Sequence, residues 1–294
     1  MNGILNIYKE KGMTSHDVVS RVRRILGTRQ VGHTGTLDPD AEGVLPICVG
    51  KGTKAAELLS SSTKGYRATM RLGITTDTQD MSGHVQKRAP VSCTAEGIRD
   101  AALSFVGEVD QIPPMYSAIK QGGKKLYELA REGIEVERKA RHIIIYQMTV
   151  HSIQNDLVEF SVLCSKGTYI RTLCADIGTK LGCGAAMERL LRTSCGKWFQ
   201  LKDAVSLETL AEAKEEGTLS SLLTPIDAFF AEHPALVLNE VSSARVKNGV
   251  PIYVKEPEGV TYRVYDSAGN FLTLSKTERN EEGRVCLQRI KGFY

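Results

Sequence analysis

An aspartate in a short, constrained loop is the strongest candidate for chemistry in this chain. Asp38 lies in the run Gly-His-Thr-Gly-Thr-Leu-Asp-Pro at residues 32–39. The two glycines reach backbone angles that are closed to other residues, and the proline restricts the backbone of the aspartate before it. Stiff loops that present one side chain often carry catalytic residues, although the same residue types also make plain turns. An ionised aspartate held in this way can act as a nucleophile or as a base.

The patterns of several other kinds of site are missing. The seven cysteines form no CxxC pair and the six histidines form no HExxH motif, so we expect no metal site. Residues 43–51 have the wrong glycine spacing for a P-loop, and no GxGxxG fingerprint occurs. No stretch approaches the roughly 20 apolar residues that a membrane span needs, and the first residues do not resemble a signal peptide. With no disulfide framework indicated, we expect a cytoplasmic protein that does not enter a membrane.

Regular patterns on both sides of the aspartate predict the elements that position it. Residues 4–8 and 44–50 have the apolar character of short strands. Between them, a capping box at Thr14 predicts the start of a helix, and Gly27 is a plausible end. Residues 66–72 alternate between apolar and polar side chains, which is typical of a half-buried strand.

The remaining patterns predict two domains. Further strands at 143–150 and 157–164 and helices at 95–106 and after residue 169 mix irregularly. This order favours an α+β domain with a mixed, largely antiparallel central sheet and flanking helices. After residue 235 come closely spaced short strands with glycine-rich turns, which are typical of a small all-β barrel or sandwich. We therefore expect domains at 1–235 and 236–294.

A basic segment at about 113–142 is predicted to leave the core of the first domain as an arm. It carries seven lysines and arginines against four glutamates, and glycines and prolines interrupt it. Such a charged, partly mobile segment suits contact with a phosphate backbone, and Lys120, Lys124 and Lys125 are its candidate RNA-binding residues. The alternative is a solvated surface helix in which glutamates and lysines pair. The formal net charge of the chain, +4, is too small to identify a nucleic-acid binder by itself, but the clustering of these lysines with Tyr116 and Tyr127 favours RNA contact.

Four motifs together resemble one protein family. They are the loop at 32–39, Lys-Gly-Tyr-Arg at 64–67, Pro-Met-Tyr-Ser-Ala-Ile-Lys at 114–120 and Ser-Lys-Gly-Thr-Tyr-Ile-Arg at 165–171. In this order and spacing they resemble the bacterial tRNA pseudouridine synthase B family over about residues 3–235. The tail is similar, more weakly, to the small RNA-binding PUA domain that the family often carries.

The resemblance implies a pseudouridine synthase fold and a function. It implies an isomerase that turns the T-loop uridine of tRNA, position 55, into pseudouridine, with no cofactor. It also implies that tRNA is the partner. The sequence shows no N-terminal extension and no lysine-rich tail, so we expect action without a guide RNA, and we expect a monomer.

The resemblance further implies roles for individual residues. Asp38 falls on the catalytic aspartate, Tyr66 on a tyrosine that stacks against the target base, and Arg171 on an arginine that pairs with the aspartate. His33 falls on a histidine that fills the space left by the extruded base, and Leu190 on an apolar pocket residue. Lys9 falls on a lysine of the family's early turn and is expected to contact the substrate, although the usual proline after it is replaced by glutamate.

Alternatives stay open at this point. The sequence does not decide whether Asp38 attacks the sugar, attacks the base or acts as a base toward the sugar. A non-catalytic module that binds or folds tRNA on the same scaffold is the main competing function, and a hydrolase is a weaker one because no second acid accompanies Asp38. An arginine beside Asp38 is expected to favour its ionised form.

Overall fold

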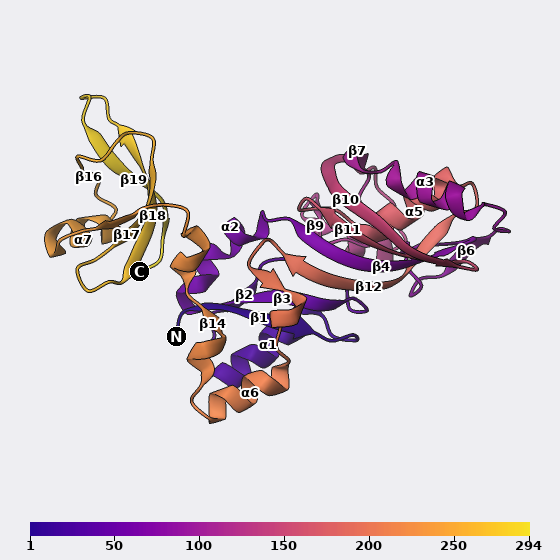
Figure 1. Cartoon of the computed structure of the whole chain (residues 1–294), viewed down its shortest axis with the longest axis horizontal. Helices are drawn as coiled ribbons and strands as arrows, with labels where there is room; N and C mark the ends of the chain where they lie inside the picture. Colours follow the sequence, from indigo (N-terminus) through magenta and orange to yellow (C-terminus); the bar gives the residue numbers. More distant parts are fainter.

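The computed structural model describes all residues, 1–294, and a ten-stranded sheet forms its centre (Figure 1). The strand order is β14-β1-β3-β12-β4-β11-β10-β7, with β2 paired to β3 and β13 paired to β12. The bounds are β1 (Gly3–Lys9), β2 (Val31–His33), β3 (Glu42–Val49), β4 (Lys64–Leu72), β7 (Gly107–Gln111), β10 (Arg141–Gln154), β11 (Leu157–Cys164), β12 (Ala185–Cys195), β13 (Phe199–Gln200) and β14 (Leu223–Thr224). Its strand pairs are antiparallel except for β3 with β12. The prediction of a largely antiparallel sheet is confirmed.

Two pairs of helices cover different halves of this sheet (Figure 1). Helices α1 (Ser15–Leu26) and α6 (Leu207–Glu215) share an apolar core with β1, β2 and β3, whereas α3 (Ala95–Leu103) and α5 (Ile170–Lys180) share one with β4, β10, β11 and β12. The capping box at Thr14 is formed, and Gly27 ends α1 in the left-handed conformation. Shorter helical segments are η1 (Gly50–Ala55), α2 (Ala56–Ser60), η2 (Leu201–Asp203), η3 (Leu219–Leu222) and η4 (Ile226–Phe230).

The two halves of the sheet meet where β3 runs beside β12. Only two residue pairs join these strands, Glu42 with Leu191 and Gly43 with Arg192. Gly43 has a φ of 104°, and a Cβ there would lie 2.3 Å from the carbonyl oxygen of Arg192. Glycine is therefore required at this junction. The patterns above did not predict β12, although it is one of the central strands.

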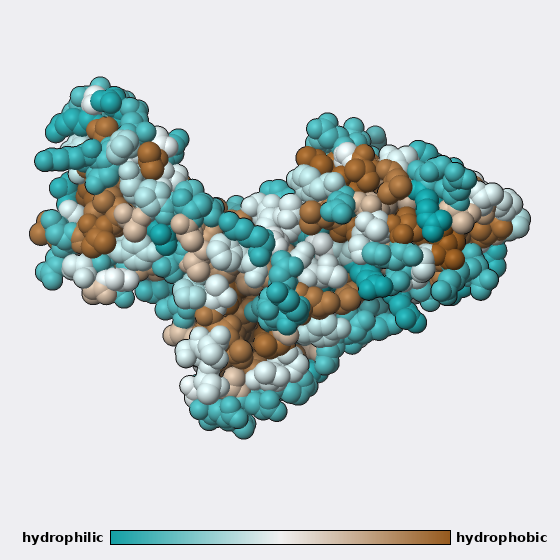
Figure 2. Space-filling view, in the orientation of Figure 1, coloured by the Kyte–Doolittle hydropathy of each residue, from teal (hydrophilic) through white to brown (hydrophobic).

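The C-terminal domain is a curled five-stranded sheet with one helix. Its strand order is β15-β17-β18-β19-β16. The bounds are β15 (Ala235–Val237), α7 (Glu240–Lys247), β16 (Ile252–Tyr253), β17 (Thr261–Tyr265), β18 (Phe271–Arg279) and β19 (Val285–Gly292). Helix α7 was not predicted, because the sequence Glu-Val-Ser-Ser-Ala-Arg-Val-Lys carries almost no apolar stripe and buries only Ser243 and Val246. Brown, hydrophobic patches are visible on this domain in Figure 2. Its exposed large apolar side chains are Val237, Val241, Val250, Tyr253 and Ile290.

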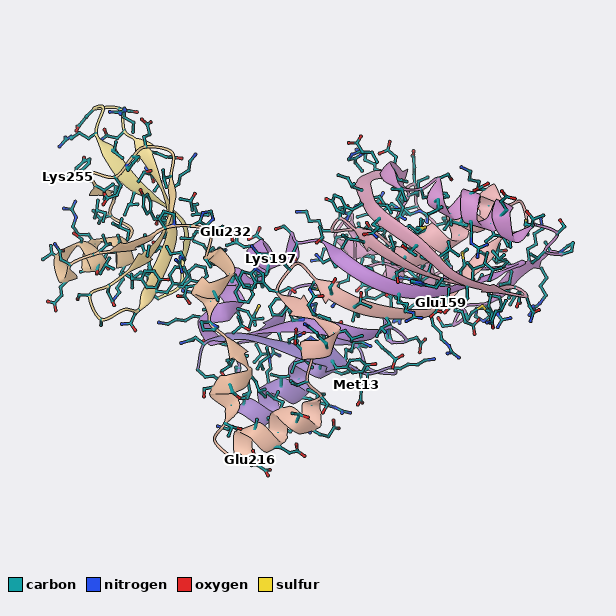
Figure 3. All side chains as sticks on the ribbon, in the orientation of Figure 1. Met13, Glu159, Lys197, Glu216, Glu232 and Lys255 are labelled. Carbon is teal, nitrogen blue, oxygen red and sulfur yellow. The ribbon has the colours of Figure 1, made fainter.

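An aromatic cluster fastens the C-terminal domain to the rest of the molecule. The ring of Phe293 lies 4.9 Å from that of Phe271 and 6.1 Å from that of Phe230, which belongs to η4. These rings are part of a core that also contains residues of β1 and β3. Lys197 and Glu232, both labelled in Figure 3, add an ion pair of 3.3 Å beside this junction. The apolar core thus continues across the predicted boundary at residue 235.

Two small hairpins project from the sheet. One consists of β5 (Ile74–Thr76) and β6 (Val85–Arg88), and the other of β8 (Lys120–Gln121) and β9 (Lys124–Lys125), followed by α4 (Leu126–Arg131). The second hairpin lies in the predicted basic arm. None of the helices is long and apolar enough to cross a membrane.

Candidate active site

The loop that carries Asp38 joins β2 to β3 and is held by hydrogen bonds from two earlier elements. The hydroxyl of Ser15, at the start of α1, accepts from the Leu37 amide at 2.8 Å and lies 3.2 Å from its carbonyl oxygen. The ammonium of Lys9, at the end of β1, donates to the carbonyls of Glu10, Pro39 and Ala41 at 2.5–3.0 Å. Residues on both sides of Asp38 are therefore fixed before any substrate arrives.

Arg171 contacts both oxygens of the Asp38 carboxylate. Its Nε lies 3.0 Å from Oδ2 and its Nη2 lies 3.3 Å from Oδ1. The same guanidinium donates to the carbonyls of Thr78 at 3.0 Å and Tyr116 at 2.8 Å, and its side chain is only 6% exposed. Arg171 lies in the first turn of α5, where a cation is unfavourable without an acid nearby. The carboxylate supplies that acid, and the two-pronged contact orients it.

A second acid, Asp80, lies on the other side of Arg171 and was missed in the sequence. Its Oδ2 is 3.6 Å from Arg171 Nη1, and its Oδ1 accepts from the Thr78 hydroxyl at 2.6 Å and from the amide of Ser82 at 3.0 Å. The signal that could have found it is the run Thr-Gln-Asp-Met-Ser at 78–82, because an acid flanked by hydroxyl residues commonly caps a turn. Arg171 therefore lies between two carboxylates.

The pKa of Asp38 reflects competing influences. Burial raises it above the value of an ordinary aspartate, the Arg171 guanidinium lowers it, and the negative charge of Asp80 raises it. The net direction is upward. The Asp38 side chain is still 39% exposed, so its burial is partial. Arg171 offsets part of the cost of this partial burial, in the sense expected from the sequence, but does not hold the pKa below its usual value.

Asp38 lies between two cavities, and both are also lined by Arg171 and Leu190. The smaller cavity, of about 330 Å³, is further lined by Tyr66, which is 9% exposed and whose hydroxyl has a raised pKa because it is buried. The larger one, of about 700 Å³, is lined by residues of the arm, including Tyr116 and Tyr127. A carboxylate at such a junction can reach a group placed in the first cavity while the rest of a larger ligand occupies the second.

Comparisons with known proteins agree with this geometry. The model of the TruB family pseudouridylate synthase N-terminal domain matches residues 23–170, and that of the tRNA pseudouridylate synthase B C-terminal domain matches residues 171–231. The chain belongs to the TruB family.

Curated relatives of this family member cover nearly its whole length. A tRNA pseudouridine synthase B of Alkaliphilus oremlandii is 50% identical over 272 residues, which is 90% of both chains. One of Clostridium perfringens strain SM101 is 46% identical over 291 residues, covering 96% of this chain and 97% of the relative. Among solved structures, a chain of a Cbf5-Nop10-Gar1 complex superposes with a TM-score of 0.73 at 26% identity, covering 99% of this chain and 85% of that one. The predicted family and fold class are confirmed.

The structure places the other predicted TruB site residues in three different settings. Leu190 is 8% exposed and lines both cavities beside Asp38. His33 lines neither of these cavities, its Nδ1 accepts from the Gly35 amide at 3.2 Å, and burial lowers its pKa. Lys9 is fully buried, and its ammonium is occupied by three carbonyls. The expectation that Lys9 contacts the substrate is not supported by this geometry, because contact would require breaking those bonds; Lys9 instead holds the loop.

The arm lysines lie apart from the two cavities. Lys120 and Lys124 are exposed, and none of Lys120, Lys124 and Lys125 lines either cavity beside Asp38. Lys124 forms an ion pair with Glu132 at 3.0 Å, and the Lys125 ammonium donates to the Tyr127 hydroxyl at 3.1 Å. Both the RNA-contact and the surface-pairing interpretations predicted exposed lysines, and the ion pair with Glu132 shows that pairing does occur.

Arg192 is a further residue that the sequence did not single out. It is only 1% exposed, lines the smaller cavity and has no carboxylate within ion-pair distance. Its Nε donates to the Val44 carbonyl at 2.6 Å and its Nη2 to the Gly35 carbonyl at 3.3 Å. A strand predicted around Leu190 would have pointed to Arg192, because side chains two residues apart in a strand lie on the same face of the sheet.

Proposed function

We propose that this protein converts uridine 55 in the T-loop of tRNA to pseudouridine, with Asp38 as the central catalytic residue. By its family and its relatives the chain is a tRNA pseudouridine synthase, and therefore an isomerase. The observation that carries the assignment of the site is the Asp38–Arg171 pair, placed between two cavities and next to the buried ring of Tyr66.

The reaction explains why a nucleotide-sized cavity lies beside a larger opening. The C1′–N1 glycosidic bond breaks, the uracil turns and a C1′–C5 bond forms; C5 loses its proton and N1 gains one, so no redox change or group donor is involved. Because these atoms are enclosed in the folded T-loop, the nucleotide must be extruded into the protein. The smaller cavity receives the extruded uridine in this proposal, and Tyr66 stacks against its base as aromatic residues do in other RNA sites. The larger cavity accommodates neighbouring nucleotides.

Asp38 acts in its ionised form. Its carboxylate attacks the sugar or the base, or removes a proton from the sugar, and all three routes need a free electron pair on oxygen. Arg171 keeps the carboxylate pointing into the cavity through its two contacts. The Lys9, Ser15 and Arg192 hydrogen bonds keep the loop from relaxing when the base is extruded. Such preorganisation is a large part of how enzymes lower barriers.

The proposal extends to how the RNA is held. The basic arm at 113–142 binds the T-stem and T-loop backbone, and His33 fills the space left by the extruded base after a movement of its side chain. The domain at 236–294, with nine basic and seven acidic residues, contacts another part of the tRNA. We further propose that the protein acts as a cytoplasmic monomer and without a guide RNA.

Tritium release tests the assignment directly. A tRNA transcript with 5-tritiated uridine is incubated with the wild type, with Asp38→Asn and with Asp100→Asn, which alters an exposed acid on α3 that lines neither cavity. Asp38→Asn should slow release by at least about 1000-fold, since it removes the reacting group, while Asp100→Asn should stay near the wild-type rate. Affinity for tRNA, measured by filter binding, should change little in either variant.

Two results would contradict the proposal. Release by Asp38→Asn at a rate near that of the wild type would remove Asp38 from the chemistry. No release by any of the three proteins, with tRNA still bound, would favour a module that only binds or folds tRNA.

A further inference from the structure

A buried hydroxyl without a partner lines the smaller cavity beside Asp38. Ser117 is 5% exposed, and its Oγ makes no hydrogen bond. The other buried polar side-chain atoms without partners are Asn6 Oδ1, Arg23 Nε, Arg138 Nε and Ser243 Oγ, and none of these residues lines either cavity at Asp38. Buried polar groups are nearly always paired, so an unpaired one in a ligand site points to a bond made with the ligand.

The backbone of Ser117 is fixed in relation to the ion pair. Its amide donates to the Met115 carbonyl at 2.9 Å, and its carbonyl accepts from the Tyr127 amide at 3.1 Å. The preceding carbonyl, that of Tyr116, accepts from Arg171 Nη2, and this nitrogen is also 3.3 Å from Asp38 Oδ1. Ser117 therefore follows directly on a peptide group that touches the catalytic pair.

Three other hydroxyls that line this cavity are already used by the protein. The Ser60 hydroxyl donates to the Glu57 carbonyl at 2.7 Å, that of Ser165 accepts from the Ile144 amide at 2.9 Å, and that of Thr168 donates to the Ser165 carbonyl at 3.0 Å. Thr34, in the Asp38 loop, is equally buried and its hydroxyl makes no hydrogen bond either, but only in Ser117 is the hydroxyl oxygen itself buried without a partner. Its hydrogen can rotate, so it can donate to one group and accept from another.

We propose that Ser117 Oγ hydrogen-bonds the ribose 2′-hydroxyl of the extruded uridine, an inference that rests on the function proposed above. During the isomerisation the uracil turns, so a bond to its edge would have to break, whereas the sugar stays in place. A residue next to the Asp38–Arg171 pair is suited to hold the sugar, because the bonds that break and form meet at C1′. The 2′-hydroxyl is both a donor and an acceptor, which matches a serine, and it distinguishes RNA from DNA. Ser117 thereby contributes to the choice of a ribonucleotide.

The test measures two proteins, the wild type and Ser117→Ala, on two RNAs that differ only in the 2′-hydroxyl of one nucleotide. Wild type and Ser117→Ala are each given a tRNA with 5-tritiated uridine or 5-tritiated 2′-deoxyuridine at position 55, the RNAs being otherwise identical. The unlabelled RNAs are also used as competitors, so that an RNA that binds without reacting still gives an inhibition constant. Ser60→Ala is the matched control, because it removes a hydroxyl from the same cavity that already has a protein partner. Thermal melting checks that each variant is folded.

Loss of one neutral hydrogen bond should lower kcat/KM of Ser117→Ala on the uridine tRNA by roughly 3- to 10-fold. On the 2′-deoxyuridine tRNA, Ser117→Ala and the wild type should have the same kcat/KM or the same inhibition constant. Ser60→Ala keeps Ser117 and should therefore show the same difference between the uridine and 2′-deoxyuridine tRNAs as the wild type.

The outcomes that overturn the inference are distinct. An equal loss on both RNAs would place the bond on the uracil or make it structural, and no loss on either would mean that the hydroxyl does not touch the nucleotide. If the proposed function itself is wrong, the wild type will release no tritium. That result would also rule out the proposed contact between Ser117 and the ribose.

Discussion

The Asp38 loop and the basic arm are both built from polar residues, yet the protein holds them in opposite ways. The loop is fixed by Lys9, Ser15, Arg171 and Arg192, which come from four different elements and are all buried. The arm makes its polar contacts mainly within itself, as in the pairs of Lys124 with Glu132 and Arg138 with Glu135.

This difference shows two ways of using charge. A reacting carboxylate has to be placed to within a fraction of an ångström, so the chain surrounds it with buried donors that have little freedom. A phosphate-binding surface needs net charge more than geometry, and its exposed pairs contribute little to stability. Variants in the two regions should therefore fail differently, in turnover for the loop and in affinity for the arm.

Lys9→Met should give the largest effect of this kind. It removes the ammonium that bonds three carbonyls around Asp38, and a displacement of about 1 Å at the carboxylate can cost about 100-fold in rate. We expect kcat to fall by about that factor while the dissociation constant for tRNA stays within about 2-fold. Single-turnover tritium release and filter binding measure the two. Lys51→Met, at an exposed lysine, is the control, and a loss confined to affinity would show that Lys9 contacts RNA after all.

Charge reversal in the arm should give the opposite pattern. Lys124→Glu with Lys125→Glu should weaken tRNA binding by about 10-fold or more and reduce the slope of log affinity against log salt by about 1 to 2. The rate at saturating tRNA should be close to that of the wild type. Glu132→Gln is the matched opposite variant, because it frees Lys124 from its ion pair and should tighten binding slightly. An unchanged salt slope in the double variant would argue against contact between these lysines and phosphates.

Asp80→Asn should produce the smallest change, and mainly in pH dependence. The negative charge of Asp80 raises the pKa of Asp38, so its removal lowers that pKa. Since the ionised carboxylate is the active form, the acid side of the kcat/KM profile should move to lower pH. Activity at neutral pH should fall by about 3- to 10-fold, because Asp80 also helps to hold Arg171. Asp100→Asn, at an exposed acid that lines neither cavity, should leave the profile in place. A move of the acid side to higher pH in Asp80→Asn would contradict the interaction described.

The strands and helices that pattern alone predicted are those with strong local signals. The helix from Thr14 to Gly27 has a capping box and a glycine stop, and β4 and β11 alternate cleanly. Strand β12 was not predicted, because its partners β3 and β4 are far away in sequence and because Glu188, Arg189 and Arg192 and a register shift interrupt its apolar alternation. Helix α7 was not predicted, because it buries too few apolar side chains to show the periodicity of a helix.

The site was predictable only where a motif marks it. Asp38, Tyr66 and Arg171 stand in conspicuous motifs, and the structure brings all three to one cavity. Asp80 and Arg192 matter through partners that lie far from them along the chain, and Ser117 through a cavity assembled from distant segments; no local pattern reports such distances. For Lys9 the motif was visible but the role was not. A lysine in an early turn looks the same in sequence whether its ammonium faces solvent or bonds to buried carbonyls.

The outer edge of β1 has a consequence for how the chain is made. This edge pairs with Val205 and with β14, segments that leave the ribosome about 200 residues after β1. At about 5–20 residues per second, β1 waits roughly 10 to 40 seconds with one side unpaired. An open strand edge is a template for wrong pairing with other chains. Nascent chains that stop before residue 205 should therefore aggregate or recruit chaperones, whereas chains released after residue 224 should not.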